Sequence, residues 1–245
     1  MTLVKSESQK IKDDIHSILR SLLMRKIFFL LTGILFMVCS VSVLAKTTEK
    51  PVIRVIGGKA DDYKDSQGRI WFGGLQKFNI KDDDSWGGWI GTEPQTAEVK
   101  NLTDAAKAQA DKAGYDHAIF HTVSWAKYPD TVQMGLRTGN GVFDVTYLVG
   151  EHWSPDNRGF DIFIEDENVA PLYVAPGADE IDIKIFKNVS VTDGVLNLNF
   201  AGNEETGKGD LNATFSGIEV IPVGKGTAVN PKAKLASVWA EIKKN

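Results

Sequence analysis

The stretch "GVFDVTYLVGEHWSPDNRGFDIFI", residues 141–164, decides the fold class. Every second residue over 143–149 is apolar, which is the period of a β-strand that buries one face. A polar turn over 154–158 then leads into a second alternating run. Glu151 and Trp153 continue the parity of the first strand past the end of its hydrophobic run. Two strands that present a carboxylate and an indole at a loop indicate a ligand platform on a β-sandwich rather than a catalytic centre.

The composition is that of a globular protein with one main domain. The chain has 245 residues, of which 42% are hydrophobic and 24% are charged. It holds 23 glycines and only 8 prolines, which favours many tight turns over disorder. We found no internal repeat or low-complexity tract.

The N-terminal region has the pattern of an export signal over 24–45. A short basic start is followed by an almost uninterrupted apolar run over 27–44, and Ala45 provides the small residue of a cleavage site. Residues 1–23 are then an upstream extension outside the mature protein, with Met24 as the initiator. The alternative is an uncleaved membrane anchor, because the run approaches the length of a bilayer span. We expect a secreted, periplasmic or cell-surface protein.

Removal of 1–45 leaves an acidic chain without cysteine. It carries 22 Lys and Arg against 29 Asp and Glu, a net charge of −7, and Cys39 leaves with the signal. A negative domain is a poor candidate for nucleic acid or for an anionic membrane surface. We therefore expect no nucleic-acid partner, no membrane contact after signal cleavage and no disulfide.

The main domain, over 50–223, is expected to be all-β, an antiparallel β-sandwich of the jelly-roll kind. Its short alternating segments are separated by Gly, Asp and Asn, with few helices between them. The expected strands are 52–56, a segment around 70–72, 117–125, 132–136, 142–149, 160–164, 172–175, 181–186 with 189–191, 196–200 and 218–223.

One segment of the domain breaks the strand pattern. A helix over 105–113, capped by Thr103 or Asp104 and ended by Gly114, has almost only alanine as its apolar residues. We expect it to be a solvated insertion that contributes little core.

The C-terminal region, 224–245, is expected to be a linker followed by an amphipathic helix. Its apolar residues Leu235, Val238, Trp239 and Ile242 share one stripe. The stripe covers either this domain or a partner protein.

Six segments in order resemble the malectin-type carbohydrate-binding domains, which are galactose-binding-like β-sandwiches. They are "IRVIGGKADDYKDSQGRIW" (53–71), "GTEP" (91–94), "DHAIFHTVSW" (116–125), "GVFDVTYLVGEHW" with "RGFDIFIE" (141–165), "VTDGVLNLNF" (191–200) and "GIEVIP" (217–222). The chain departs from the family where His152 and Trp153 follow the glutamate, and in an insertion over 93–114.

The resemblance implies a saccharide site in which Trp86, Trp125 and Trp153 stack on sugar rings and Asp210 binds hydroxyls. Aromatic faces suit the C–H face of a pyranose, and carboxylates suit its hydroxyl rim. Trp89 is the alternative to Trp86, and an ordinary turn residue is the alternative for Asp210. The further candidates at loop positions are Glu151, which we expect to brace its loop or a hydroxyl, Tyr128 and His152. Trp71 is expected in the core.

No cofactor is expected. His117 and His121 share a predicted strand face, but without a third ligand they are interpreted as ordinary sheet histidines. The run over 82–84 is interpreted as a solvated acidic turn; structural calcium there has no supporting motif.

Three functions compete. The first is a secreted, non-catalytic protein that binds an oligo- or polysaccharide, of glucan type or related. The second is a glycoside hydrolase or lyase, or its accessory subunit, with Glu151 and Asp210 as a carboxyl pair; no nucleophile elbow or zinc-protease motif is found. The third is an adhesion or scaffold protein that uses the sandwich for protein contacts.

Overall fold

The computed structural model describes residues 50–79, 81–82, 85–206 and 209–224. The predicted extension 1–23, the predicted signal 24–45 and the predicted C-terminal helix lie outside the described residues, as do two of the three aspartates over 82–84. None of the described helices has the length and apolar character needed to cross a membrane.

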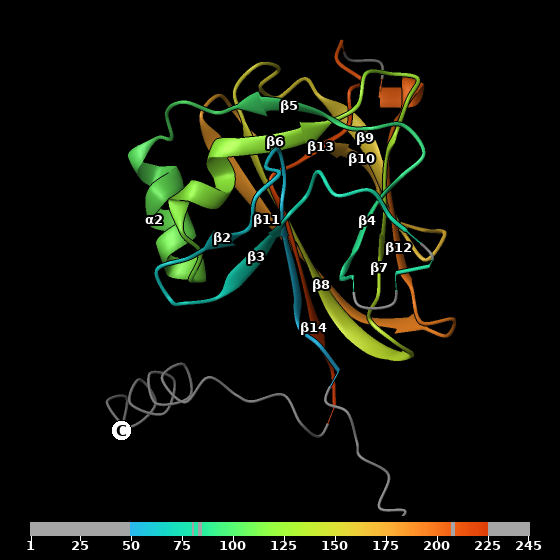
Figure 1. The fold of residues 1–245 in the computed structure, drawn as a ribbon. Helices are drawn as coiled ribbons and strands as arrows, with labels where there is room; N and C mark the ends of the chain where they lie inside the picture. The colour runs from blue at the N-terminus through green and yellow to red at the C-terminus, as the bar shows by residue number, and fades with distance from the viewer. Residues whose placement is uncertain (1–49, 80, 83–84, 207–208, 225–245) are drawn as a thin grey trace, which may run out of the picture. The chain divides into compact units, whose positions relative to one another are not determined.

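The larger sheet has six strands in the order β11-β8-β14-β1-β3-β2 (Figure 1). These are β11 (Glu180–Val191), β8 (Gly141–Glu151), β14 (Gly217–Pro222), β1 (Ile53–Ile56), β3 (Ile70–Gly73) and β2 (Tyr63–Lys64). Neighbours pair antiparallel, except that β1 and β3 are parallel.

The second sheet has five antiparallel strands in the order β10-β9-β12-β7-β4. These are β10 (Glu167–Val174), β9 (Gly159–Ile164), β12 (Leu196–Gly202), β7 (Val132–Leu136) and β4 (Gly87–Ile90). A small third sheet, β13 (Thr214–Phe215), β6 (Thr122–Trp125) and β5 (Gln95–Glu98), lies at one end of the sandwich (Figure 1). The helices are α2 (Asp104–Ala113) and the 3-10 helices η1 (His117–His121) and η2 (Glu204–Thr206).

The main core lies between the two large sheets. Alternate residues of β8 and β12 are buried in it, namely Phe143, Val145, Tyr147, Val149, Leu196, Leu198 and Phe200. The predicted all-β antiparallel sandwich is therefore confirmed. The strand predicted over 132–136 has the same bounds as β7. Its apolar residues pair in register with those of β12.

The segment predicted as one strand over 117–125 is instead η1 followed by β6, so the prediction is wrong for 117–121. The sequence His-Ala-Ile-Phe-His places Ile119 and Phe120 next to each other, and both are fully buried. Adjacent residues of a strand point to opposite faces, whereas one 3-10 turn directs both side chains toward one cluster. Burial of both residues in the same cluster therefore accompanies the helical turn.

The Gly- and Asp-rich stretch that holds Trp86 and Trp89 is not among the predicted strands, yet it contains β4. Gly87 and Gly88 lie so close to neighbouring backbone that a Cβ atom on Gly87 would sit 2.1 Å from the carbonyl oxygen of Gly135. Glycine is therefore required there by the close approach of β4 to β7, and its presence does not prevent pairing.

The helix α2 was expected to contribute little core, and this too is corrected. Its residues Ala106 and Ala110 are buried in a second cluster, together with Trp71, Ile119 and Phe120. Small side chains allow the helix to pack closely over the outer face of the six-stranded sheet. Of the two predicted caps, Thr103 is the one observed, and its side chain accepts a hydrogen bond from the Ala106 N–H at 3.0 Å.

Candidate functional site

The loop between β8 and β9 is held by the carboxylate of Glu151. One oxygen, Oε1, accepts hydrogen bonds from the backbone N–H groups of His152 (2.8 Å), Trp153 (2.7 Å) and Ser154 (3.0 Å). The residue is only 1% exposed. Glu151 therefore fixes the backbone that carries Trp153, in agreement with the expected bracing role, and it has no open approach from solvent.

Arg158 joins this carboxylate to a second one. Its Nε lies 2.7 Å from Glu151 Oε2 and its Nη2 lies 3.0 Å from Asp210 Oδ2. Its Nη1 donates to the carbonyl oxygen of Asn212 at 2.8 Å. Ser154 also donates to Asp210. The guanidinium thus fastens the loop after β8 to the segment that leads into β13, and the three charged groups sum to a net charge of −1.

Trp125 reaches the same place from the third sheet. It is the last residue of β6, where it pairs with Thr214 of β13 and Gln95 of β5. Its indole Nε1 is buried and hydrogen-bonds to no partner among the described residues. The ring is therefore held by packing, in part against the second core cluster.

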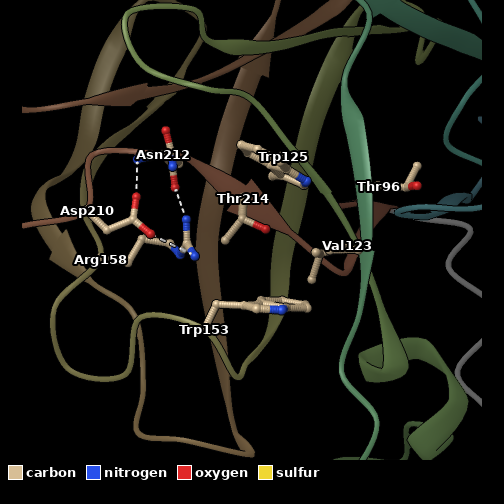
Figure 2. A pocket seen from close by; sticks show the side chains of 9 residues that line it. Thr96, Val123, Trp125, Trp153, Arg158, Asp210, Asn212 and Thr214 are labelled. Carbon is tan, nitrogen blue, oxygen red and sulfur yellow. Dashed lines mark hydrogen bonds and ion pairs between the residues drawn. The ribbon is translucent and has the colours of Figure 1, made fainter.

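These elements enclose a pocket of about 270 Å³. Figure 2 shows Trp125 and Trp153 on two sides of it, with Arg158, Asp210 and Asn212 together at one end. The lining residues are Thr96, Ala97, Val123, Trp125, Trp153, Arg158, Asp210, Asn212 and Thr214. Trp153 is 44% exposed, so its ring face is open to a ligand.

The pocket offers two kinds of contact to one ligand. Two indoles and the side chains of Ala97 and Val123 provide apolar surface, and the amide NH2 of Asn212 provides a donor. The Asp210 carboxylate accepts from Arg158, Ser154 and the Asn212 N–H and keeps one further acceptor position for a hydroxyl group. This combination fits a compact molecule with an apolar face and a hydroxyl rim.

Three predicted residues, Trp125, Trp153 and Asp210, are brought together here. Sequence reasoning missed Arg158 and Asn212, as well as the wall that Thr96 and Ala97 of β5 contribute. Arg158 lies in the predicted polar turn over 154–158. It is 52 positions from Asp210 in the sequence, so no local pattern indicates that the two side chains pair. The β5 wall lay within the insertion over 93–114, for which only the helix was predicted.

The other tryptophans lie elsewhere. Trp86 packs against the main core and stacks on Phe72, with ring centroids 5.8 Å apart and an interplanar angle of 9°. Trp89 is 8% exposed and its Nε1 donates to the Leu75 carbonyl at 3.3 Å. Neither lines the pocket. Trp71 is fully buried, which confirms its predicted place in the core.

Tyr128 and His152 stand beside the pocket without lining it. The hydroxyl of Tyr128 donates to Glu204, and this hydrogen bond raises the pKa of the phenol. The Nδ1 atom of His152 lies 2.6 Å from Asp179 Oδ1, and its ring meets the Trp153 ring edge-on. His152 thus supports the position of Trp153.

The structure offers no metal-binding cluster among the residues it describes. His117 Nε2 lies 2.8 Å from Asp111, and His121 Nδ1 lies 2.7 Å from the Val99 carbonyl, so each histidine contacts a different group. Both belong to η1 rather than to the predicted strand face.

Comparisons with known proteins show the fold. No protein-family model and no curated protein matches the sequence. Among solved structures, the extracellular domain of ANXUR1 from Arabidopsis thaliana matches with a TM-score of 0.56 at 12% identity, over 71% of this chain and 48% of that one. That of ANXUR2 matches with 0.56 at 14%, over 71% and 49%. A Bacteroides uniformis beta-glucuronidase 2 matches with 0.54 at 14%, over 74% of this chain and 19% of the enzyme.

The chain therefore spans about half, or less, of the structures it resembles. At these identities the likeness shows the sandwich and nothing finer. It agrees with the fold that the resemblance to malectin-type domains implies.

Proposed function

We propose that this protein is a non-catalytic carbohydrate-binding protein whose site is the pocket between Trp125 and Trp153. The observation that carries the proposal is the convergence of two indoles with Asp210 and Asn212 on one pocket. Aromatic stacking removes the apolar face of a sugar from water, and the polar end of the pocket receives its hydroxyl groups. The ligand is a saccharide of glucan type or related.

The state of Glu151 favours binding over catalysis. Both carboxylate oxygens are engaged, one by three backbone N–H groups and the other by Arg158. A general acid or nucleophile must reach the glycosidic bond, and this carboxylate is enclosed. An assay for product release from glucans tests the enzyme alternative; turnover that Glu151→Gln abolishes contradicts a purely binding role.

The test of the proposal is calorimetry against a panel of glucan, galactan and xylan oligosaccharides. Shallow sites of this kind are expected to bind at about millimolar to micromolar Kd. Trp153→Ala should weaken binding by about tenfold or more, because it removes a stacking surface and its buried area. Ile185→Ala is the matched control, since Ile185 is an exposed apolar residue on β11 and does not line the pocket. A wild-type protein that binds none of the panel, or an unchanged Trp153→Ala, overturns the proposal.

We propose further that the chain is exported. The apolar run over 27–44 supports this, and the extracellular domains among its structural relatives agree with it. N-terminal sequencing of the protein recovered outside the cytoplasm should begin at Lys46; any other start contradicts the proposed cleavage.

A further inference from the structure

The outer face of the six-stranded sheet is covered in one part and open in another among the described residues. The covered part lies under α2 and η1, where Leu148 of β8 and Ile181 of β11 are buried in the second cluster. On the same face but further along the strands, Ile185 is 53% exposed. The face therefore changes from covered to open within four residues of β11.

The open part carries four exposed apolar residues, with the Lys187–Asp144 ion pair (2.7 Å) among them. Val142, Val223 and Val52 are all among the exposed large hydrophobic residues, with Val52 at 40%. The register places them side by side on one face, since the Val223 N–H donates to the Val142 carbonyl and Ile53 pairs with Val220. We call Ile185, Val142, Val223 and Val52 the open patch. Ile185 pairs with Thr146, so Asp144 lies between it and Val142 on this face, and the Lys187–Asp144 ion pair leaves no net charge there. Exposed apolar residues gathered on one sheet face are typical of a surface that something covers.

The chain itself leaves the sandwich at this patch. Gly224 follows Val223 directly, and 21 further residues follow Gly224, outside the described part. Within them, Leu235, Val238, Trp239 and Ile242 have the spacing of one helical stripe. A stripe and a patch that belong to one chain meet at a high effective concentration.

The dimensions and the charge of the C-terminal segment are compatible with contact between its stripe and the open patch. The linker 225–232 reaches up to about 26 Å when extended. A helix over 233–245 is about 20 Å long, and the four strands from β11 to β1 span about 15 Å. The tail 225–245 carries five lysines and one glutamate, whereas 46–224 carries 17 basic and 28 acidic residues. Opposite net charges draw the two parts together.

We propose that the C-terminal segment folds back as a helix whose Leu235, Val238, Trp239 and Ile242 stripe covers the open patch. It thereby completes the second layer that α2 and η1 begin on this face. The occupant is this chain's own tail, and neither a second copy nor another protein is needed.

Thiol labelling tests the proposal in the full exported chain. Ile185→Cys places a thiol on the patch, and the chain's single cysteine, Cys39, leaves with the predicted signal or is replaced by Ser. We expect the thiol to react at least about fivefold more slowly than in the double variant Ile185→Cys/Trp239→Asp, because the docked tail must open first. Val174→Cys is the control, since Val174 is 41% exposed on β10 of the other sheet. Its rate should be unaffected by Trp239→Asp.

Equal labelling rates with and without Trp239→Asp overturn the proposal. Protection that increases with protein concentration, together with a dimer in sedimentation, also overturns it, because the occupant is then a second copy. Protection at constant rate over a hundredfold dilution, with a monomer throughout, supports it.

Discussion

At the scale of single residues, the Glu151 carboxylate makes more of the hydrogen bonds that hold the site together than either indole does. The substitution Glu151→Ala removes the acceptor of the buried Arg158 Nε and of three backbone N–H groups, while Arg158 keeps its contacts with Asp210 and the Asn212 carbonyl. Breaking a buried ion pair from one side costs about 3–5 kcal/mol, so we expect a loss of that order in the free energy of unfolding. Saccharide binding should fall with it, because the loop of Trp153 loosens. Urea denaturation checks the stability, and Glu204→Ala, a carboxylate in the exposed pair with Tyr128, serves as control with a loss below about 1 kcal/mol.

Asp210 should set the charge preference of the pocket. Its negative charge exceeds what Arg158 neutralises, because Glu151 shares the same guanidinium. We expect a uronate-bearing saccharide to bind about tenfold more weakly than its neutral counterpart, a difference that salt reduces. The variant Asp210→Asn should reduce this difference in affinity, and it should also weaken the binding of the neutral saccharide. Calorimetry of both ligands, in the wild type and in Asp210→Asn, tests this prediction. Tighter binding of the uronate than of the neutral saccharide contradicts the role given to Asp210.

At the scale of elements, the turn between β2 and β3 is organised by a buried aspartate. Burial acts to raise the pKa of Asp65, but hydrogen bonds from the Trp71 indole (3.0 Å) and from Arg69 outweigh it and hold the pKa below the usual 3.8. A carboxyl whose pKa is lower in the folded state stabilises the protein above about pH 4, and this contribution is lost as the pH falls through the folded pKa. We expect Asp65→Asn to be less stable than the wild type at pH 7, with the difference shrinking below about pH 4. Denaturation at both pH values checks this.

Elements with one buried face were predictable, and those shaped by close tertiary contact were not. In β7, β8 and β12 the alternation of apolar and polar residues indicates which face of the strand is buried. In β4, however, pairing depends on how closely Gly87 approaches Gly135, which is a property of the neighbour. Likewise, η1 forms where Ile119 and Phe120 enter a cluster that α2 completes, and the alanines of α2 gave no local sign of that cluster.

The site shows the same division. Trp125 and Trp153 stand at strand ends, so their position beside a loop could be inferred from the sequence alone. Asp210 entered only through the family resemblance, and Arg158 not at all, since an ion pair between distant positions leaves no periodic signal. Trp86 and Trp89 sit in a glycine-rich stretch that resembles a loop, yet they pack against the main core and a neighbouring carbonyl.

At the scale of the whole molecule, the two ends of β8 lie near two different surfaces, the pocket and the open patch. Its end at Glu151 carries the pocket, while its start at Gly141 lies beside Val223, where the chain leaves the sandwich (Figure 1). Eleven residues of strand place these ends about 33 Å apart. Ile185, the member of the open patch nearest to the pocket, pairs with Thr146, which is about 17 Å along the strand from Glu151. The proposed tail contact and the proposed saccharide site should therefore be independent.

Trp239→Asp in the full chain tests this independence. We expect the saccharide Kd to stay within about twofold of the wild type, since distant sites without shared partners act additively. In the same sample, the labelling of Ile185→Cys should accelerate. Trp153→Ala should show the converse, a weakened Kd with unchanged labelling. A Kd that shifts by more than about fivefold in Trp239→Asp means that the tail reaches the pocket end, and the placement of its stripe on the open patch is then wrong.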